Sequence, residues 1–253
     1  MQRSLHTAEI AGRFAREAAA LGEGEVCAVF RRSFYARFED QRGASHFACV
    51  GDASLGRGPL NALVRNLALP AIGDAVSISA ENASLWEPPA PMRGVPDADS
   101  IRSAAAPYVP HEGLGCLLLG KHNALSGYAQ PGLEALERWL VGNALGDEAE
   151  LLIGLGPGLT PSGDDYFGGM LVALRLLERG GQADSLWRWL EARLKKRTSA
   201  ISAAHLSAAS AGQAHEALHA VLNGSINMEA LDAVGHCSGW DGLAGAMAVL
   251  RAS

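Results

Sequence analysis

A glycine-rich segment that ends in two adjacent carboxylates carries the strongest chemical signal in this chain. The segment is IGLGPGLTPSGDD, residues 153–165, and an apolar stretch with helical character follows it. Alternate glycines before a helix start can direct several main-chain N–H groups at one point, which suits a bound phosphate or carboxylate. We therefore predict that Gly156 and Gly158 bind a substrate anion, with the hydroxyls of Thr160 and Ser162 beside them.

The two aspartates that end the segment change the kind of site it predicts. Asp164 and Asp165 would repel a bare anion. They suit a site in which a divalent cation lies between them and the anion, or in which one carboxylate accepts a substrate N–H or proton. We predict both as catalytic residues and as ligands of Mg²⁺. The segment has neither the Gly-Lys-Ser/Thr of a P-loop nor the spacing of a dinucleotide-binding turn, so no nucleotide cofactor is predicted.

A second segment repeats part of this pattern towards the end of the chain. SGDDYFGGMLVAL, Ser162–Leu174, aligns without a gap with SGWDGLAGAMAVL, Ser238–Leu250. The Ser, the Gly, one Asp, a second Gly and the last Leu coincide, so Asp241 corresponds to Asp165. We predict two equivalent helix starts that face each other, with Asp241 as a third catalytic carboxylate and Ser238 as a further substrate-binding hydroxyl.

A structural interpretation of the same residues stays open. Thr160 or Ser162 can cap the following helix, and Asp165 stands at the acidic position of a capping box. Carboxylates in a first helical turn are also favoured by the helix dipole, by about 0.3–1 kcal/mol each. Capping does not explain glycines inside the two proposed helices, such as Gly169 and Gly245, since each costs about 1 kcal/mol relative to alanine. Close approach of a second helix or of a ligand would explain them.

A competing metal motif, H-E-x-x-H, occurs at His215–His219. On one helix its two imidazoles would face the same side, as in zinc peptidases. The usual third ligand does not follow, and His236 and Asp241 are the other downstream candidates. We therefore expect a solvent-facing helix turn. We expect His205 to be structural and Lys121 to be a surface lysine, although either could line a site.

Composition limits the class of protein. The chain has 253 residues, a length that suits one large domain or two small ones. Of these residues 48% are hydrophobic, and the formal net charge is −6. The acidic balance argues against nucleic acid as a partner, and the basic run Lys195–Arg197 is expected to be a solvated helix end. Four scattered cysteines, the lack of a signal-peptide pattern and the lack of a membrane-length apolar run predict a cytoplasmic protein.

The elements that must position these residues fall into two halves. A helical pattern covers residues 8–21, and three strand-like runs follow, at residues 25–40, 44–51 and 74–88. Five prolines within residues 88–107 predict a connection without regular helix or central strand. Runs rich in Ala and Leu then predict helices at residues 133–145, 166–180, 184–196, 214–224 and 243–253.

Segregation of strands and helices along the chain is typical of the α+β class. We predict a mostly antiparallel, β-rich domain with a leading helix over residues 1–130. A helical domain over residues 131–253 would then carry the Gly/Asp motifs.

Three motifs together resemble a bacterial family. They are GLGPGLTPSGDDYFGG (154–169), TSAIS (198–202) and GHCSGWDGLAGAMA (235–248). In order and spacing they resemble a family first described as uncharacterised proteins or carboxylases, whose better-described members are the AllH-type subunits of oxamate carbamoyltransferase. VFRRSFY, residues 29–35, fits the first half of that family more loosely.

The resemblance implies a cytoplasmic protein of anaerobic allantoin degradation, a branch of purine catabolism. It implies two other carbamoyltransferase subunits as partners, and a reaction that interconverts oxalurate plus phosphate with oxamate plus carbamoyl phosphate. Carbamoyl phosphate and oxamate are small anions, which agrees with the anion site predicted at the glycines. Cys237 and Trp240 stand inside the last motif, at positions where variation is expected.

Two other classes of function stay open. The chain could be a non-catalytic assembly or regulatory subunit, whose motifs pack two helices or bind an anion. It could also be an independent carboxylase-like or metal-dependent enzyme. The catalytic interpretation requires bare main-chain amides and the clustered acids to meet at one polar pocket where the helical half begins. Acids that point apart and are sealed beneath side chains, with no cavity beside them, would rule it out.

Overall fold

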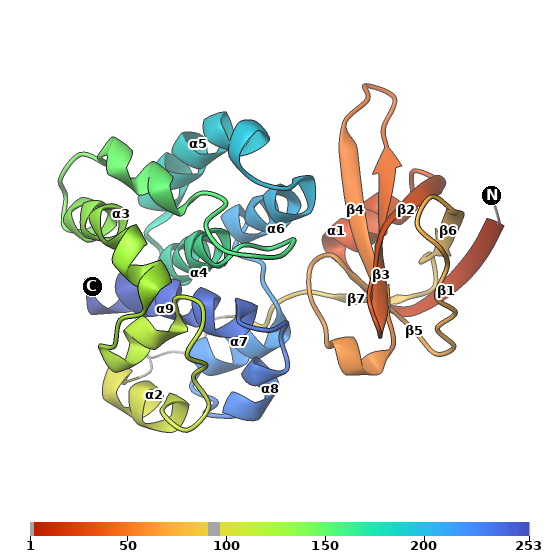
Figure 1. Cartoon of the computed structure of the whole chain (residues 1–253). Helices are drawn as coiled ribbons and strands as arrows, with labels where there is room; N and C mark the ends of the chain where they lie inside the picture. The colour runs from red at the N-terminus through yellow and green to blue at the C-terminus, as the bar shows by residue number, and fades with distance from the viewer. Residues whose placement is uncertain (1–2, 91–96, 253) are drawn as a thin grey trace. The chain divides into compact units, whose positions relative to one another are not determined.

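The computed structural model describes residues 3–90 and 97–252. The chain forms two compact units, Met1–Pro89 and Ala90–Ser253. The first is built mainly of strands and the second of helices, which confirms the predicted α+β class (Figure 1). Part of the proline-rich connection predicted from the sequence, residues 91–96, lies outside the described residues.

The strands of the first unit form one sheet. They are β1 (Arg3–Gly12), β2 (Glu23–Val29), β3 (Ser33–Glu39), β4 (Ser45–Gly51), β5 (Asn61–Val64), β6 (Ala75–Ser79) and β7 (Ser84–Trp86). Their order is β5-β4-β3-β2-β6-β1-β7, and β5 also pairs with β1, so the sheet closes into a barrel with β7 beside β1. Among the described pairings, antiparallel contacts prevail, as predicted, by four to three.

Small residues fill much of the barrel interior. Four alanines there have no exposed surface: Ala11, Ala36, Ala48 and Ala62. Phe34 and Phe38 stand four residues apart on β3 and therefore point to the same face, where both are buried. The short helix α1 (Arg13–Ala19) buries alanines against the same core.

The helix predicted over residues 8–21 is wrong in its first part. Residues up to Gly12 belong to β1, which pairs with β6 and β7 in parallel and with β5 antiparallel. Pairing along both edges of β1 outweighs the helical preference of its Ala and Glu residues, because each pairing satisfies main-chain groups that a helix would satisfy locally. The helix begins at Arg13 and the chain turns at Gly22, where φ is +102°.

The regular elements described in the second unit are all helical. Its helices are α2 (Ala98–Ala105), α3 (Ala124–Leu140), α4 (Ser162–Leu176), α5 (Gly180–Arg197), α6 (Ala200–Ser210), α7 (Glu216–Leu222), α8 (Met228–Asp232) and α9 (Ser238–Arg251). Short 3₁₀ segments lie at Gly115–Leu119 and Asp147–Leu152. Each helix predicted after Gly132 overlaps one of these, and the boundary predicted between residues 130 and 131 falls within α3.

Helix α2 corrects the prediction that residues 88–107 contain no regular helix. No proline stands between Asp97 and Pro107, and the Asp97 side chain accepts a hydrogen bond from the Ser100 N–H at 2.9 Å. A capped stretch of eight residues that is free of proline can form a helix even when prolines flank it.

Helix α4 lies in the core of the second unit. Phe167, Met170 and Leu171 on α4 have no exposed surface and belong to a cluster that includes side chains of α3, α5 and α9. Across the described residues, the helices fall short of the length and apolarity that crossing a membrane requires.

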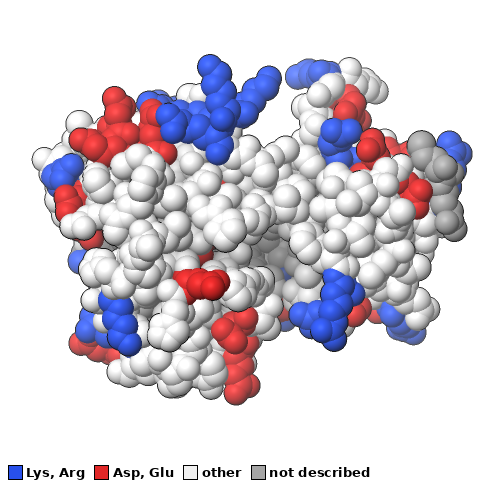
Figure 2. Space-filling model, viewed as in Figure 1, with Lys and Arg blue, Asp and Glu red and all other residues white. Residues whose placement is uncertain are grey.

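The basic run Lys195–Arg197 forms the last turn of α5, and its side chains are exposed. Figure 2 shows Lys and Arg side chains gathered along the edge of the view where α5 lies. The predicted solvated helix end is therefore confirmed.

Candidate functional site

Helix α4 begins without a side-chain cap. Its N-cap residue is Pro161, whose carbonyl oxygen accepts hydrogen bonds from the N–H groups of Asp164 and Asp165 at 2.9 and 3.0 Å. Neither Thr160 nor Ser162 caps the helix, so the capping box predicted as the structural alternative is wrong. Both aspartates do lie in the first turn, where the helix dipole favours negative charge.

Helices α4 and α9 face each other through reciprocal glycines. A Cβ atom at Gly169 would overlap the carbonyl oxygen of Gly242, and one at Gly245 would overlap the carbonyl oxygen of Tyr166. In the alignment of the two segments, Gly169 corresponds to Gly245 and Tyr166 to Gly242. The predicted pair of facing helix starts is therefore confirmed, and close helix packing accounts for two of the interior glycines.

The first turns of both helices also contain a glycine that allows close backbone contact. A Cβ atom at Gly163 of α4 would overlap the carbonyl oxygen of Leu152, and one at Gly239 of α9 would overlap that of Leu231. Each helix start is thus pressed against the chain segment that precedes it. The Ser-Gly pair that opens both motifs has one packing role in both places.

The Asp164 carboxylate holds three chain segments together. Its Oδ1 accepts a hydrogen bond from the Gly154 N–H at 2.8 Å, and its Oδ2 accepts one from the Ser202 hydroxyl at 2.6 Å and another from the Thr198 hydroxyl. Burial raises the pKa of Asp164, while the Ser202, Thr198 and Gly154 contacts lower it. Asp164 therefore holds the start of the segment 154–160 against residues 198–202, and hydrogen bonds occupy both of its oxygens.

The TSAIS motif supplies the donors for this arrangement. Besides Thr198 and Ser202, it contains Ser199, which caps α6 by accepting the Ser202 N–H at 2.9 Å. The Ser199 hydroxyl also donates to the carbonyl oxygen of Leu159 at 2.6 Å. From the sequence alone, these residues were notable only for the family resemblance. Three hydroxyls within five residues were the signal that could have identified their role.

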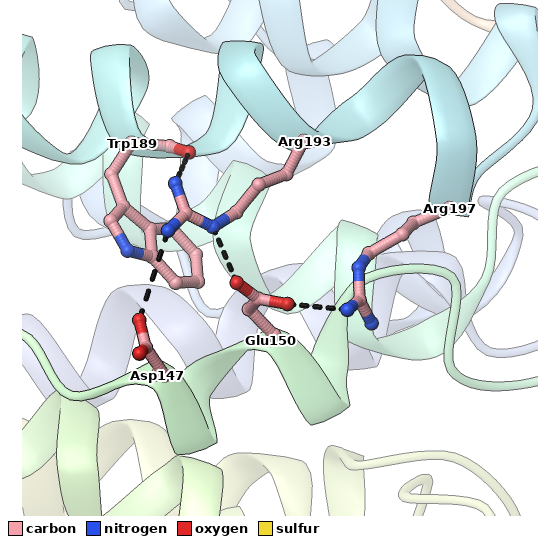
Figure 3. Close-up of polar contacts among 5 residues, drawn as sticks. All are labelled: Asp147, Glu150, Trp189, Arg193 and Arg197. Atoms are coloured by element: carbon pink, nitrogen blue, oxygen red, sulfur yellow. Dashed lines mark hydrogen bonds and ion pairs between the residues drawn. The ribbon is translucent and has the colours of Figure 1, made fainter.

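A group of ion pairs fixes the end of α5 beside Gly154. Figure 3 shows Glu150 between Arg193 and Arg197, with a hydrogen bond from Arg193 Nε to Glu150 Oε1 of 2.7 Å. The Arg193 guanidinium also lies 4.4 Å from the centre of the Trp189 ring. A Cβ atom at Gly154 would overlap the carbonyl oxygen of Arg197, so glycine lets the loop pass α5 closely.

The Asp241 carboxylate is buried at the start of α9. Its Oδ1 accepts hydrogen bonds from the N–H groups of Leu114 and Gly115, and its Oδ2 is buried without a hydrogen-bond partner among the described residues. Burial is the largest cause of a pKa raised to about 6, which the Ser162 side chain and the two amides partly offset. The contribution of the Leu114 and Gly115 amides was not predicted, because they lie more than 120 residues earlier in the chain.

Asp165 faces the opposite helix start. The side chains of Ser238 and Thr160 lower its pKa, but burial and the charges of Asp241 and Asp164 raise it well above the ordinary value. The hydroxyls of Thr160 and Ser238 lie 3.0 Å apart. Asp165 Oδ2 is also buried without a hydrogen-bond partner within the described ranges. We call Asp165 and Asp241 the acid pair.

The contacts of the acid pair are reciprocal. Asp165 on α4 is influenced by Ser238, the first residue of α9, and Asp241 on α9 is influenced by Ser162, the first residue of α4. Two of the three predicted catalytic carboxylates therefore meet, together with the predicted hydroxyls. The third, Asp164, turns to other partners.

The loop over residues 154–160, here called the glycine loop, presents main-chain amides without acceptors. Gly156 and Gly158 have φ of +114° and +95°, a backbone region that favours glycine. Within the described part of the chain, the N–H groups of Gly156, Gly158, Leu159 and Thr160 donate no hydrogen bond. Gly158 is exposed, so the tip of the glycine loop is open to solvent.

The magnesium donor set predicted from the sequence does not fit this geometry. Both oxygens of Asp164 already accept hydrogen bonds, and they point to Gly154, Thr198 and Ser202. Mg²⁺ at Asp164 would have to displace these contacts to reach a carboxylate oxygen. We therefore derive no chemical step through the ion, and its presence stays a prediction.

The H-E-x-x-H segment does not form the helix face of a zinc peptidase. His215 precedes α7 as its N-cap, and its Nδ1 accepts the Ala217 N–H at 3.2 Å. His219 Nε2 accepts the Ala214 N–H at 3.1 Å, and burial lowers the pKa of His219 to about 4. Both rings thus use a nitrogen to bind main chain, which fits a structural role. The expectation of a solvent-facing turn is wrong, because His219 is buried with Ala217 and Leu218.

The two remaining candidate residues lie in different surroundings. His205 on α6 is half-buried, and burial together with the charge of His215 lowers its pKa to about 4, so the ring is neutral at neutral pH. Lys121 is exposed just after the 3₁₀ segment Gly115–Leu119, as expected of a surface lysine.

Comparison with known proteins finds a family match in the second unit and none in the first. Comparisons with curated proteins and with solved structures give no match. One family model matches, and its match is confined to the second unit, where it includes the glycine loop, the TSAIS motif and both helices of the acid pair. The predicted resemblance is therefore confirmed over residues 152–250, which match the family described as oxamate carbamoyltransferase subunit AllH.

Proposed function

We propose that this chain is a subunit of an oxamate carbamoyltransferase-like complex and that it binds a small anionic substrate between the glycine loop and the acid pair. One observation carries the proposal. Amides that donate no hydrogen bond within the described residues stand next to two hydroxyls and two buried carboxyls that each have an unpartnered oxygen. The complex would interconvert oxalurate plus phosphate with oxamate plus carbamoyl phosphate.

The raised pKa of Asp165 removes the objection that this acid would repel an anion, whereas Asp241, with a pKa of about 6, is still mostly ionised at neutral pH. Burial raises the pKa of Asp241 to about 6 and that of Asp165 well above its ordinary range. A protonated carboxyl is neutral and donates a hydrogen bond, so it can face a phosphate or carboxylate oxygen. The amides of Gly156 and Gly158 would bind the same anion from the loop, with the Thr160, Ser162 and Ser238 hydroxyls at its edge.

The chemical step needs a proton at one place. A phosphate oxygen attacks the carbamoyl carbon of oxalurate, the bond from that carbon to the oxamate nitrogen breaks, and the nitrogen leaves as the amide of oxamate. Protonated Asp165 would donate the proton to this nitrogen, and its carboxylate would take the proton back in the reverse direction. The charge of Asp241 would help to keep Asp165 protonated, since it raises the pKa of Asp165.

The surface around the glycine loop agrees with a site that other subunits complete. Two open hollows of the surface are lined by residues of the first unit, and neither includes the acid pair or the glycine loop. A substrate bound at the exposed loop tip would need a cover that excludes water from the reaction. We propose that two other carbamoyltransferase subunits provide this cover, in the cytoplasm.

Substitution Asp165→Asn in the assembled complex tests the catalytic role. Turnover should be lost while the melting temperature stays nearly constant, because asparagine keeps the shape but cannot transfer the proton. A large loss of stability with turnover intact would show that the acid pair only packs two helices. Full activity of the partner subunits without this chain would instead show an assembly or regulatory role.

Ligand screening by thermal shift tests the anion site separately. Phosphate, carbamoyl phosphate and oxamate should each raise the melting temperature, and ATP should have no larger effect than phosphate. The same series with and without Mg²⁺ tests the predicted ion. Gly158→Ala, at a φ of +95°, should weaken the shift caused by each anion, because it strains the loop that presents the amides.

A further inference from the structure

Three side chains outside the proposed substrate site bring three kinds of metal ligand together. A carboxylate oxygen of Glu112, an imidazole nitrogen of His236 and the sulfur of Cys237 lie within 4.8 Å of one another. His236 Nε2 lies 2.8 Å from Glu112 Oε2. Across the described residues, this is the one group of three such side chains at that separation.

The fold holds the two contributing segments in register. Asp241 Oδ1 accepts the N–H groups of Leu114 and Gly115, which fixes the residues just after Glu112 to the first turn of α9. Gly113 has a φ of +73°, and a Cβ atom there would lie 3.0 Å from the Cβ atom of Cys237. The buried hydrogen bonds from the Leu114 and Gly115 N–H groups to Asp241 therefore hold the two segments of the cluster together.

We propose that Glu112, His236 and Cys237 bind one Zn²⁺ ion, with the fourth coordination position open. Zinc accepts nitrogen, sulfur and oxygen ligands in tetrahedral sites, and three protein ligands plus one water is the pattern of an open zinc site. Magnesium and calcium prefer oxygen ligands alone, so a set that includes imidazole and thiolate selects against them. This inference goes beyond the proposed function and does not depend on it.

Exposure and charge both favour entry of a cation. The side chains of His236 and Glu112 are 81% and 73% exposed, so an ion can reach them from solvent. The carboxylate of Glu112, one of the three proposed ligands, lies at the cluster itself and would attract a cation.

Metal titration of the full-length, tag-free chain tests the proposal. One equivalent of Zn²⁺ should bind, and Co²⁺ in its place should give the charge-transfer absorption of a cobalt–thiolate bond. Cys237→Ser, His236→Ala and Glu112→Gln should each lower zinc affinity by at least about tenfold, the loss that even changes outside the ligand shell produce. Cys237→Ser should also abolish the cobalt–thiolate absorption.

Matched variants separate these effects from general ones. Cys27→Ser removes another half-buried thiol, in the first unit, and His122→Ala removes another exposed imidazole. Both should leave the zinc affinity and the cobalt spectrum unchanged. Circular dichroism of every variant should match that of the parent chain, since the substituted side chains lie at the surface or half-buried.

Three results would overturn the proposal. They are zinc binding at well below one equivalent, unchanged affinity in the Cys237 and His236 variants, and loss of the cobalt–thiolate band in Cys27→Ser. None of them would touch the proposed substrate site, because the anion screen is performed without zinc.

Discussion

Asp164 and Asp165 are adjacent and chemically identical, yet their carboxyls have different surroundings. Asp164 accepts hydrogen bonds from Gly154, Thr198 and Ser202, whereas Asp165 has one buried oxygen with no partner within the described residues. Successive helical residues point about 100° apart, which follows from 3.6 residues per turn. Both oxygens of Asp164 thus have hydrogen-bond partners, whereas one buried oxygen of Asp165 has none among the described residues.

Substitution Asp164→Asn should destabilise the chain. Asparagine replaces one accepting oxygen by a donor that faces hydroxyl donors, and hydrogen bonds to charged groups contribute about 1.5–3 kcal/mol each, so we expect a loss of about 2–4 kcal/mol. Urea denaturation measures the difference. Asp165→Asn is the matched control and should change stability by less than about 1 kcal/mol, since no bond to its Oδ2 is lost. Equal effects of the two substitutions would contradict the separate roles.

The raised pKa of Asp241 predicts a pH dependence of stability. Its pKa rises from the ordinary 3.8 to about 6 in the folded chain, so the folded state holds this proton more tightly. The contribution is fully present below the unfolded value and is lost as pH rises through about 6, by about 3 kcal/mol in total.

Asp241→Asn isolates this contribution from other carboxyls. Asparagine keeps an oxygen that can accept the Leu114 and Gly115 N–H groups but does not titrate. The stability difference between the parent chain and the variant should therefore shift in favour of the variant between about pH 4 and pH 7. Denaturation curves at four pH values measure it, and a difference that stays constant across them would refute a raised pKa.

At the scale of elements, the contact between α4 and α9 depends on glycines with no room for a side chain. Gly245→Ala should destabilise the chain by about 3 kcal/mol or more, or prevent folding, because its Cβ atom would overlap the Tyr166 carbonyl oxygen. Gly168→Ala, on the same helix as Tyr166, is the control. Its nearest neighbour would be 3.8 Å away, so higher helix propensity should stabilise the chain by roughly 0.5–1 kcal/mol.

Chemical denaturation of both variants measures their free energies of unfolding and so distinguishes close packing from helix propensity. Equal destabilisation by Gly245→Ala and Gly168→Ala would mean that the glycines lower helix propensity and nothing more. Opposite signs would establish close packing as the reason for the glycine at residue 245.

The sequence predicted elements well where one period dominated. Leu and Ala at helical spacing identified α5, and the alignment of the two Ser-Gly segments predicted that α4 and α9 face each other. Prediction from the sequence failed for strands whose pairing partners are distant in the chain. The helix predicted over residues 8–21 begins as β1, and β5, four residues long, gave no recognisable pattern.

The sequence predicted which residues form the candidate site, but not which partners each side chain would contact. The acids, hydroxyls and glycines named from the sequence do gather at the two helix starts. The hydroxyl donors to Asp164 lie 34 and 38 residues further along the chain, and the amide donors to Asp241 lie more than 120 residues before it. Which of two neighbouring acids meets which donors is set by helix phase and tertiary packing, and a single sequence encodes neither visibly.

At the scale of the whole molecule, the two compact units have separate hydrophobic cores. The residues of the barrel core and those of the helical core form two distinct clusters. Separate cores can lose structure separately, which breaks the two-state condition.

Scanning calorimetry should therefore show a calorimetric enthalpy larger than the van't Hoff enthalpy. Asp164→Asn, which lies in the second unit, should lower one transition and leave the other in place. A single transition that moves as a whole in this variant would show that the units unfold together.

The reciprocal glycines also set an order of events during synthesis. Helix α4 cannot complete its packing until Gly245 has been made, since that residue supplies the bare backbone against Tyr166. While the ribosome is still translating the intervening stretch, the apolar and glycine surface of α4 stays uncovered. Nascent chains arrested before residue 238 should accordingly be cut by protease within α4, and chains long enough to expose α9 should resist.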